Sequence, residues 1–183
     1  MRTFIALHIP CSTELNNVFS DLRQNLKGAE VKYVESDNLH ITLSFLGETN
    51  AKQISDLCLA LQNIQLPKHS IDLQLQGVGS FKNESVPGNI WVGVKAEDSL
   101  QELFRGINDI VLLQGLVVDN RKFLPHLTLG RIKKILINNN IEELRAKYRQ
   151  ASFGKVQITE FTYYQSILTP QGPVYKPIQR FSL

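Results

Sequence analysis

Two tetrapeptides organise this chain: HITL at His40–Leu43 and HLTL at His126–Leu129. Both follow the pattern His-x-Thr-Leu, and the chain holds only 4 histidines, so the recurrence argues against coincidence. In a β-strand, residues two positions apart point to the same face. Each tetrapeptide therefore predicts a strand that presents an imidazole and a hydroxyl side by side. Two such strands lining one site would supply acid–base groups and hydrogen bonds suited to a small anion such as phosphate.

The first motif strand is expected to have one polar and one apolar face. Strict alternation places Thr42 and Ser44 on the face of His40, and it places Phe45 on the opposite face, against helices. A polar face on a central strand needs partners or solvent, and a binding site supplies both.

The second motif strand pairs His126 with Thr128 in the same way, but Arg131 lies outside the alternation. By strict period two, its side chain points away from His126. Gly130 permits a bulge or a close approach of a ligand, and a bulge would return Arg131 to the face of His126. Arg131 is therefore either a phosphate ligand or a surface or structural arginine.

A metal held between His40 and His126 is the competing chemical interpretation. The motifs lack the carboxylate or cysteine ligands that usually join such a pair, so we expect neither a metal nor another cofactor. His8 has no threonine two positions later, and we expect it to be structural. Cys11 and Cys58 lack metal-site spacing and are expected to be free thiols.

Composition predicts one ordinary globular domain spanning residues 1–183. The formal net charge of +3 is too small to indicate bulk nucleic-acid binding, although it permits local phosphate recognition. The chain shows no signal peptide and no apolar run long enough for a membrane span, so we expect a cytoplasmic protein without a membrane partner.

The order of predicted elements repeats once along the chain. Each half reads strand, helix, motif strand, helix, strand, and both Phe4 to His40 and Ile90 to His126 span 36 positions. The segment Gly77–Asn89 is predicted to be a loop between the halves or a hairpin. Strands are expected at 4–9, 40–46, 70–75, 90–94, 127–131, 154–158, 160–168 and 174–181, and helices near 15–26, 54–64, 100–111 and 141–149.

The motif blocks Asn38–Glu48 and Phe123–Arg131 resemble those of the 2H phosphoesterases. Within that superfamily, the chain is similar to the LigT-like RNA 2′,3′-cyclic phosphodiesterases, which were first described as 2′–5′ RNA ligases. The similarity extends to Arg2–Ala6 and Trp91–Val94, and more weakly to Gly172–Leu183. Relatives often carry Trp at the position of Tyr33.

The resemblance implies an α+β, bilobal fold in which two antiparallel sheets, related by a pseudo-two-fold axis, line a central cleft with helices outside. It also implies metal-independent hydrolysis of a 2′,3′-cyclic phosphate to a 2′-phosphomonoester. By that resemblance His40 is the general acid and proton donor, and His126 is the general base and proton acceptor. Thr42, Thr128 and Arg131 would bind the phosphate.

The expected partners are RNA 3′ ends or nucleotides that bear a 2′,3′-cyclic phosphate, bound by a monomer. Two alternatives stay open: an RNA-end-binding 2′–5′ ligase module whose hydrolysis is incidental, and a phosphodiesterase for small cyclic or 2′–5′-linked nucleotides. Base-contacting aromatic residues would decide between substrates, and the candidates are Tyr33, Phe81, Tyr163, Tyr164 and Tyr175.

Overall fold

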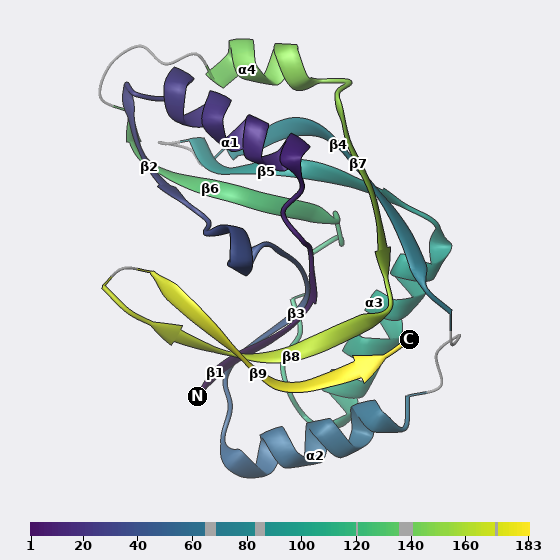
Figure 1. The fold of residues 1–183 in the computed structure, drawn as a ribbon. Helices are drawn as coiled ribbons and strands as arrows, with labels where there is room; N and C mark the ends of the chain where they lie inside the picture. The colour runs from purple at the N-terminus through teal and green to yellow at the C-terminus, as the bar shows by residue number, and fades with distance from the viewer. Residues whose placement is uncertain (65–68, 83–86, 120, 136–140, 171) are drawn as a thin grey trace.

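The computed structural model describes residues 1–64, 69–82, 87–119, 121–135, 141–170 and 172–183. These residues form two antiparallel sheets flanked by helices, so the predicted α+β class is confirmed (Figure 1). Sheet A has the order β3-β1-β8-β9, made of β3 (His40–Glu48), β1 (Arg2–His8), β8 (Glu160–Leu168) and β9 (Pro173–Ser182). Sheet B has the order β2-β6-β5-β4-β7, made of β2 (Ala29–Tyr33), β6 (His126–Ile135), β5 (Pro87–Ala96), β4 (Ile71–Lys82) and β7 (Ser152–Ile158).

The two halves of the chain are interleaved between the sheets. In sheet A the motif strand β3 pairs with β1 and β1 pairs with β8, while in sheet B the motif strand β6 pairs with β5 and β5 pairs with β4. The strand that follows the first motif in sequence, β4, therefore belongs to the sheet of the second motif. Neither sheet can form from one half of the chain alone.

Each sheet is likewise covered by one helix from each half of the chain. Helices α2 (Ala51–Gln62) and α3 (Asp98–Leu113) contact each other and sheet A, whereas α1 (Thr13–Asn25) and α4 (Ile141–Tyr148) contact each other and sheet B (Figure 1). Ser12 begins α1 by accepting a hydrogen bond from the backbone of Leu15, and Asn50 with Gln53 forms a capping box that begins α2. Among the described residues, no helix is long and apolar enough to cross a membrane.

Two features differ from the sequence-based expectation, and a third decides between two predicted alternatives. Strand β2 was not predicted; its five residues alternate between half-buried and exposed and include Glu30 and Lys32, so they carry little apolar signal. For the segment Gly77–Asn89, the hairpin alternative is confirmed, because β4 extends to Lys82, β5 begins at Pro87 and the two strands pair. Phe4 and Ile90, which each precede a motif histidine by 36 positions, are not structurally equivalent. His40 pairs with His8, whereas His126 pairs with Gly93, and the two separations differ by one residue.

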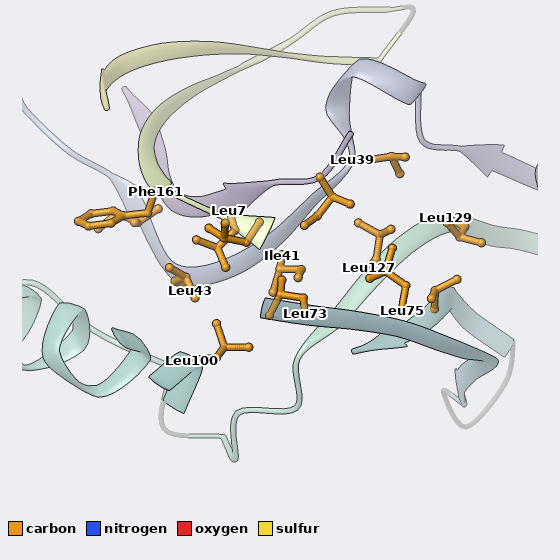
Figure 2. Packing of buried hydrophobic residues seen from close by; sticks show 14 of the residues in the cluster. Leu7, Leu39, Ile41, Leu43, Leu73, Leu75, Leu100, Leu127, Leu129 and Phe161 are labelled. Atoms are coloured by element: carbon orange, nitrogen blue, oxygen red, sulfur yellow. The ribbon is translucent and has the colours of Figure 1, made fainter. Parts of the chain in front are cut away.

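One hydrophobic core joins the two sheets. Figure 2 shows Leu7 and Ile41 from sheet A near Leu73 and Leu127 from sheet B, and all four are almost fully buried. The two motif strands β3 and β6 also contact each other where the sheets meet. Truncating a core leucine such as Leu127 to alanine typically costs about 2–5 kcal/mol of stability, so the core holds the two motifs in a fixed relation.

Candidate active site

Both motif strands contain a bulge at the same place after the histidine. In β3, Ala6 pairs with Thr42 and Ile5 pairs with Ser44, so Leu43 is an extra residue. In β6, an equivalent shift makes Leu129 the extra residue. A bulge changes which face the following residues occupy. The expectation that Ser44 shares the face of His40 is therefore wrong: Ser44 is buried and donates a hydrogen bond to Asn108 of α3, at 2.9 Å.

The bulges bring the residue five positions after each histidine back to the face of that histidine. Phe45 is 45% exposed, and the guanidinium carbon of Arg2 lies over its ring, 4.9 Å from the ring centre of Phe45. Phe45 therefore does not pack against the helices as expected. In β6 the equivalent residue is Arg131, which is exposed. The condition under which Arg131 could serve the site, a bulge near Gly130, is met.

The two histidines are held by the same backbone contact. Nδ1 of His40 lies 2.6 Å from the carbonyl oxygen of Asn38, and Nδ1 of His126 lies 2.8 Å from the carbonyl oxygen of Leu124. A carbonyl oxygen can only accept, so Nδ1 of each ring carries the proton. This fixes the tautomer and makes Nε2 the atom that gains or loses a proton on each ring.

His40 sits in an aromatic environment. Its ring centre lies 5.1 Å from that of Phe4 and 5.2 Å from that of Tyr175. Burial lowers the pKa of His40 below its usual value, and positive charge on His8 and His126 lowers the pKa further, while the hydrogen bond to Asn38 opposes the shift. The motif strands β3 and β6 contact each other, so His40 and His126 face a common site.

Arg131 reaches the same region from sheet B. Its Nε donates a hydrogen bond to Oδ1 of Asn89, at 3.1 Å, on the neighbouring strand β5. Burial raises the pKa of the Tyr175 hydroxyl, and positive charge on Arg2 and Arg131 opposes that shift. Tyr175, which packs against His40, thus lies within electrostatic reach of Arg131.

The two threonines occupy matching positions beside the histidines. Thr42 is exposed and pairs with Ala6, and Thr128 is half-buried and pairs with Trp91. All five predicted site residues therefore lie on the histidine faces of the two motif strands, although their roles stay predictions. His8, which we expected to be structural, is also exposed on this face opposite His40.

The aromatic candidates divide between the two faces. Tyr164 stacks on Phe4, with ring centres 5.2 Å apart, and Tyr175 contacts His40, so both belong to the site. Tyr33 packs instead against Phe19 of α1, and Tyr163 is buried with a hydrogen bond to Thr3. The side chain of Phe81 lies outside the described residues.

Sequence reasoning missed several polar and aromatic residues of the site. Arg2, Phe4, Asn89 and Trp91 come from β1 and β5, the strands that flank the motif strands. Alternation along β1 could have placed the side chains of Phe4 and Ile5 on opposite faces of the sheet. Nothing in their sequence indicated the pairing that brings them beside the motifs.

Metal binding has little support from the donor set. Among the described residues, no group of three or more His, Cys, Asp or Glu side chains is placed to hold a metal ion. Cys11 and Cys58 are both free thiols, as expected.

Comparison with known proteins is consistent with this arrangement. The model of the LigT-like phosphoesterase family matches the chain twice, over residues 7–91 and 92–175. An RNA 2′,3′-cyclic phosphodiesterase of Archaeoglobus fulgidus is 35% identical over 182 residues, covering 99% of both chains. One from Methanocaldococcus jannaschii is 31% identical over 181 residues, covering 99% of this chain and 100% of the relative.

Solved structures show the same fold. A protein of Thermus thermophilus superposes with a TM-score of 0.78 at 26% identity, covering 100% of this chain and 98% of its own. LigT of Escherichia coli, crystallised with 3′-AMP, also gives a TM-score of 0.78, at 25% identity over 100% of this chain and 97% of its own. With its two family matches, its paired motifs and its fold, the chain belongs to the LigT-like phosphoesterases.

Proposed function

We propose that this protein hydrolyses 2′,3′-cyclic phosphates at RNA 3′ ends or on nucleotides, leaving a 2′-phosphomonoester. The observation that carries the proposal is the pair of His-x-Thr strands in equivalent register, each with its imidazole held through Nδ1. Curated relatives that match nearly the whole chain are named RNA 2′,3′-cyclic phosphodiesterases. We propose that the reaction needs no metal ion and that a single copy of the chain carries it out.

The two histidines would act on opposite sides of phosphorus. Nε2 of His126 takes a proton from water, and the resulting hydroxide oxygen forms a bond to phosphorus. The bond from phosphorus to O3′ breaks, and Nε2 of His40 gives its proton to O3′. The two rings finish with exchanged protonation states, which solvent restores. General acid–base catalysts of this kind each contribute roughly 10²–10⁴-fold to the rate.

The remaining polar groups would hold the cyclic phosphate. The hydroxyls of Thr42 and Thr128 donate to its non-bridging oxygens, and Arg131, oriented by Asn89, offers a charge-assisted hydrogen bond. Burial lowers the pKa of His40 in the free protein, which disfavours the protonated acid before substrate binds. A bound phosphate anion favours the charged imidazolium and so raises the pKa of His40.

A single assay tests this function. The protein is incubated in EDTA with 2′,3′-cyclic AMP and with an RNA oligonucleotide that ends in a cyclic phosphate, and products are identified by phosphorus NMR. We expect 2′-monophosphate from both. No turnover of either substrate would refute the proposal. Activity that EDTA abolishes and Zn²⁺ or Mn²⁺ restores would contradict metal independence, and a 3′-monophosphate would reverse the roles of the histidines.

A further inference from the structure

A pocket of about 480 Å³ opens beside His126 on sheet B. Its walls come from β4, β5, the residues that precede β6, and the end of α4. Trp91 and Pro125 line it together with Arg145 and Arg149. The two-histidine mechanism uses His126 but leaves the rest of this pocket without a role.

The floor of the pocket is shaped to let an indole ring lie flat. A Cβ atom on Gly79 would lie only 2.2 Å from Cζ2 of Trp91, so the ring occupies the space that any side chain at this position would need. Gly79 pairs directly with Trp91 across β4 and β5. The indole thus rests on the backbone of β4 while it lines the pocket.

The pocket lies at the right place for the nucleoside part of a substrate. Trp91 pairs with Thr128, and Gly93 pairs with His126, so the backbone of Trp91 lies one strand spacing, about 4.8 Å, from the second motif. Its indole extends the other way, over Gly79 of β4, and lines the same pocket as His126. In a nucleoside cyclic phosphate, the ribose is all that separates the phosphate from the base. A phosphate held at His126 and Thr128 therefore brings the base to the pocket.

Sheet A is built differently at the equivalent position. There the residue paired with Thr42 is Ala6, which is fully buried, and the aromatic rings of Phe4, Tyr164 and Tyr175 pack on one another nearby. The pseudo-symmetry of the two motifs thus breaks at Ala6 and Trp91. At the position paired with the motif threonine, only sheet B carries an aromatic side chain, whereas the rings near His40 come from Phe4, Tyr164 and Tyr175 and pack on one another.

The lining of the pocket also carries donors for a base edge. Arg145 and Arg149 are four positions apart, at the end of α4 and just beyond it. Nη1 of Arg145 donates to both carboxylate oxygens of Glu142, at 3.0 and 2.9 Å, which orients the guanidinium. Guanidinium groups can only donate, so they match base edges that present acceptors, such as O6 and N7 of guanine.

We propose that this pocket binds the nucleobase of the nucleotide that bears the cyclic phosphate, stacked on Trp91 with its edge toward Arg145 and Arg149. The inference rests on the proposed function, since it takes the phosphate to lie at the two motifs. It names a specificity-determining role for residues that touch neither the phosphate nor the attacking water.

The test compares substrates with and without a base. Wild-type kcat/KM is measured for guanosine, adenosine and uridine 2′,3′-cyclic phosphates and for methyl riboside 2′,3′-cyclic phosphate, which lacks a base. Base–aromatic stacking predicts that removing the base lowers kcat/KM by roughly five- to hundredfold, mainly through KM. Guanosine is expected to be the best substrate.

Variants then locate the effect. Trp91→Leu, and Gly79→Ala, whose methyl group displaces the indole, should lower kcat/KM for the nucleosides by a much larger factor than for the base-free substrate. Trp91→Phe should retain most of the base effect. Arg149→Ala should remove the preference for guanosine, and Arg105→Ala, an exposed residue on α3, serves as its control. Turnover of the base-free substrate shows that each variant is folded.

Three outcomes would overturn the inference while the proposed function stands: equal wild-type kcat/KM with and without a base, equal losses on both substrate types in Trp91→Leu, or an Arg149→Ala loss confined to substrates with an added 5′-phosphate. The last would assign the arginines to an upstream phosphate. Failure of the wild-type protein to hydrolyse any cyclic phosphate would instead refute the proposed function.

Discussion

The two motif strands, β3 and β6, share one backbone design but differ in their surroundings. Both place a bulge three residues after the histidine, and both hold Nδ1 against the carbonyl two residues earlier. The strand beside β3 contributes Phe4 and His8, whereas the strand beside β6 contributes Asn89 and Gly93 at the paired positions. The repeated backbone thus positions two similar imidazoles, and the neighbouring strands make them chemically different.

The difference has a direct chemical consequence. Burial among aromatic rings lowers the pKa of His40 in the free protein, and protonation of His8 or His126 would lower that pKa further. On the other side, Arg131 stands where sheet A has Phe45, so sheet B carries the fixed positive charge on its motif strand. An imidazole whose charged form a bound phosphate favours, and a base beside a phosphate ligand, are suited to opposite steps of one reaction.

The largest effect should come from removing either imidazole. We expect His40→Gln and His126→Gln each to lower kcat by about 10²-fold or more, because each removes one acid–base catalyst. Steady-state kinetics measure the loss, with circular dichroism to verify the fold. His69→Gln, at an exposed position away from the motifs, is the matched control. Wild-type activity in either motif variant would exclude its histidine from the chemistry.

A smaller loss is expected at the position that distinguishes the two motifs. Arg131→Ala should lower kcat/KM by roughly ten- to hundredfold, because hydrogen bonds to charged groups contribute about 1.5–3 kcal/mol. The slope of binding affinity against salt concentration should flatten by less than about one unit. Phe45→Ala, at the equivalent position of β3, should change kcat/KM little. Equal losses of kcat/KM in Arg131→Ala and Phe45→Ala would contradict the proposed role of Arg131 as a phosphate ligand.

The pH dependence sharpens the comparison further. Because the charge on His8 lowers the pKa of His40, His8→Gln should raise that pKa. If His40 acts as the acid, kcat/KM falls as pH rises through its pKa in the free protein, so the basic limb should move to higher pH in His8→Gln. The pH profiles of both proteins measure this limb. An unchanged basic limb would show that His8 does not influence the pKa of the catalytic acid.

The smallest effect concerns stability. The lowered pKa of His40 means that the unfolded chain binds more protons than the folded one as pH falls below about 6.5. The folded protein should therefore lose stability in acid because of His40, and His40→Gln should remove that loss. The difference in Tm between wild type and His40→Gln is expected to shrink or reverse between pH 8 and pH 5. A constant difference would show that the folded state does not disfavour imidazolium at this position.

The sequence predicted what depends on local periodicity. The apolar positions Ile41 and Leu43, and likewise Leu127 and Leu129, are buried as alternation required. The five residues predicted from the motifs and the resemblance lie on the histidine faces of the two motif strands, and their roles stay predictions. These features depend on residues that are close together in the chain.

Features set by pairing between distant strands were not predictable in the same way. Ser44 and Phe45 exchange faces because β1 pairs around an extra residue in β3, and that register is decided by the packed sheet. The exchange of β4 and β8 between the halves, and the position of Trp91 beside Thr128, likewise depend on long-range pairing. The ambiguity about Arg131 had the same origin, since the bulge is visible only in the pairing with β5.

The central claim, that similar imidazoles of β3 and β6 perform opposite proton transfers, is tested most directly by changing the leaving atom. An adenosine 2′,3′-cyclic phosphate with sulfur in place of O3′ has a leaving group that needs little help from an acid. On this substrate, His40→Gln should regain near wild-type kcat, whereas His126→Gln should still lose about 10²-fold or more, because water must be activated in both cases. Equal losses in the two variants, or recovery by His126→Gln instead, would contradict the assignment.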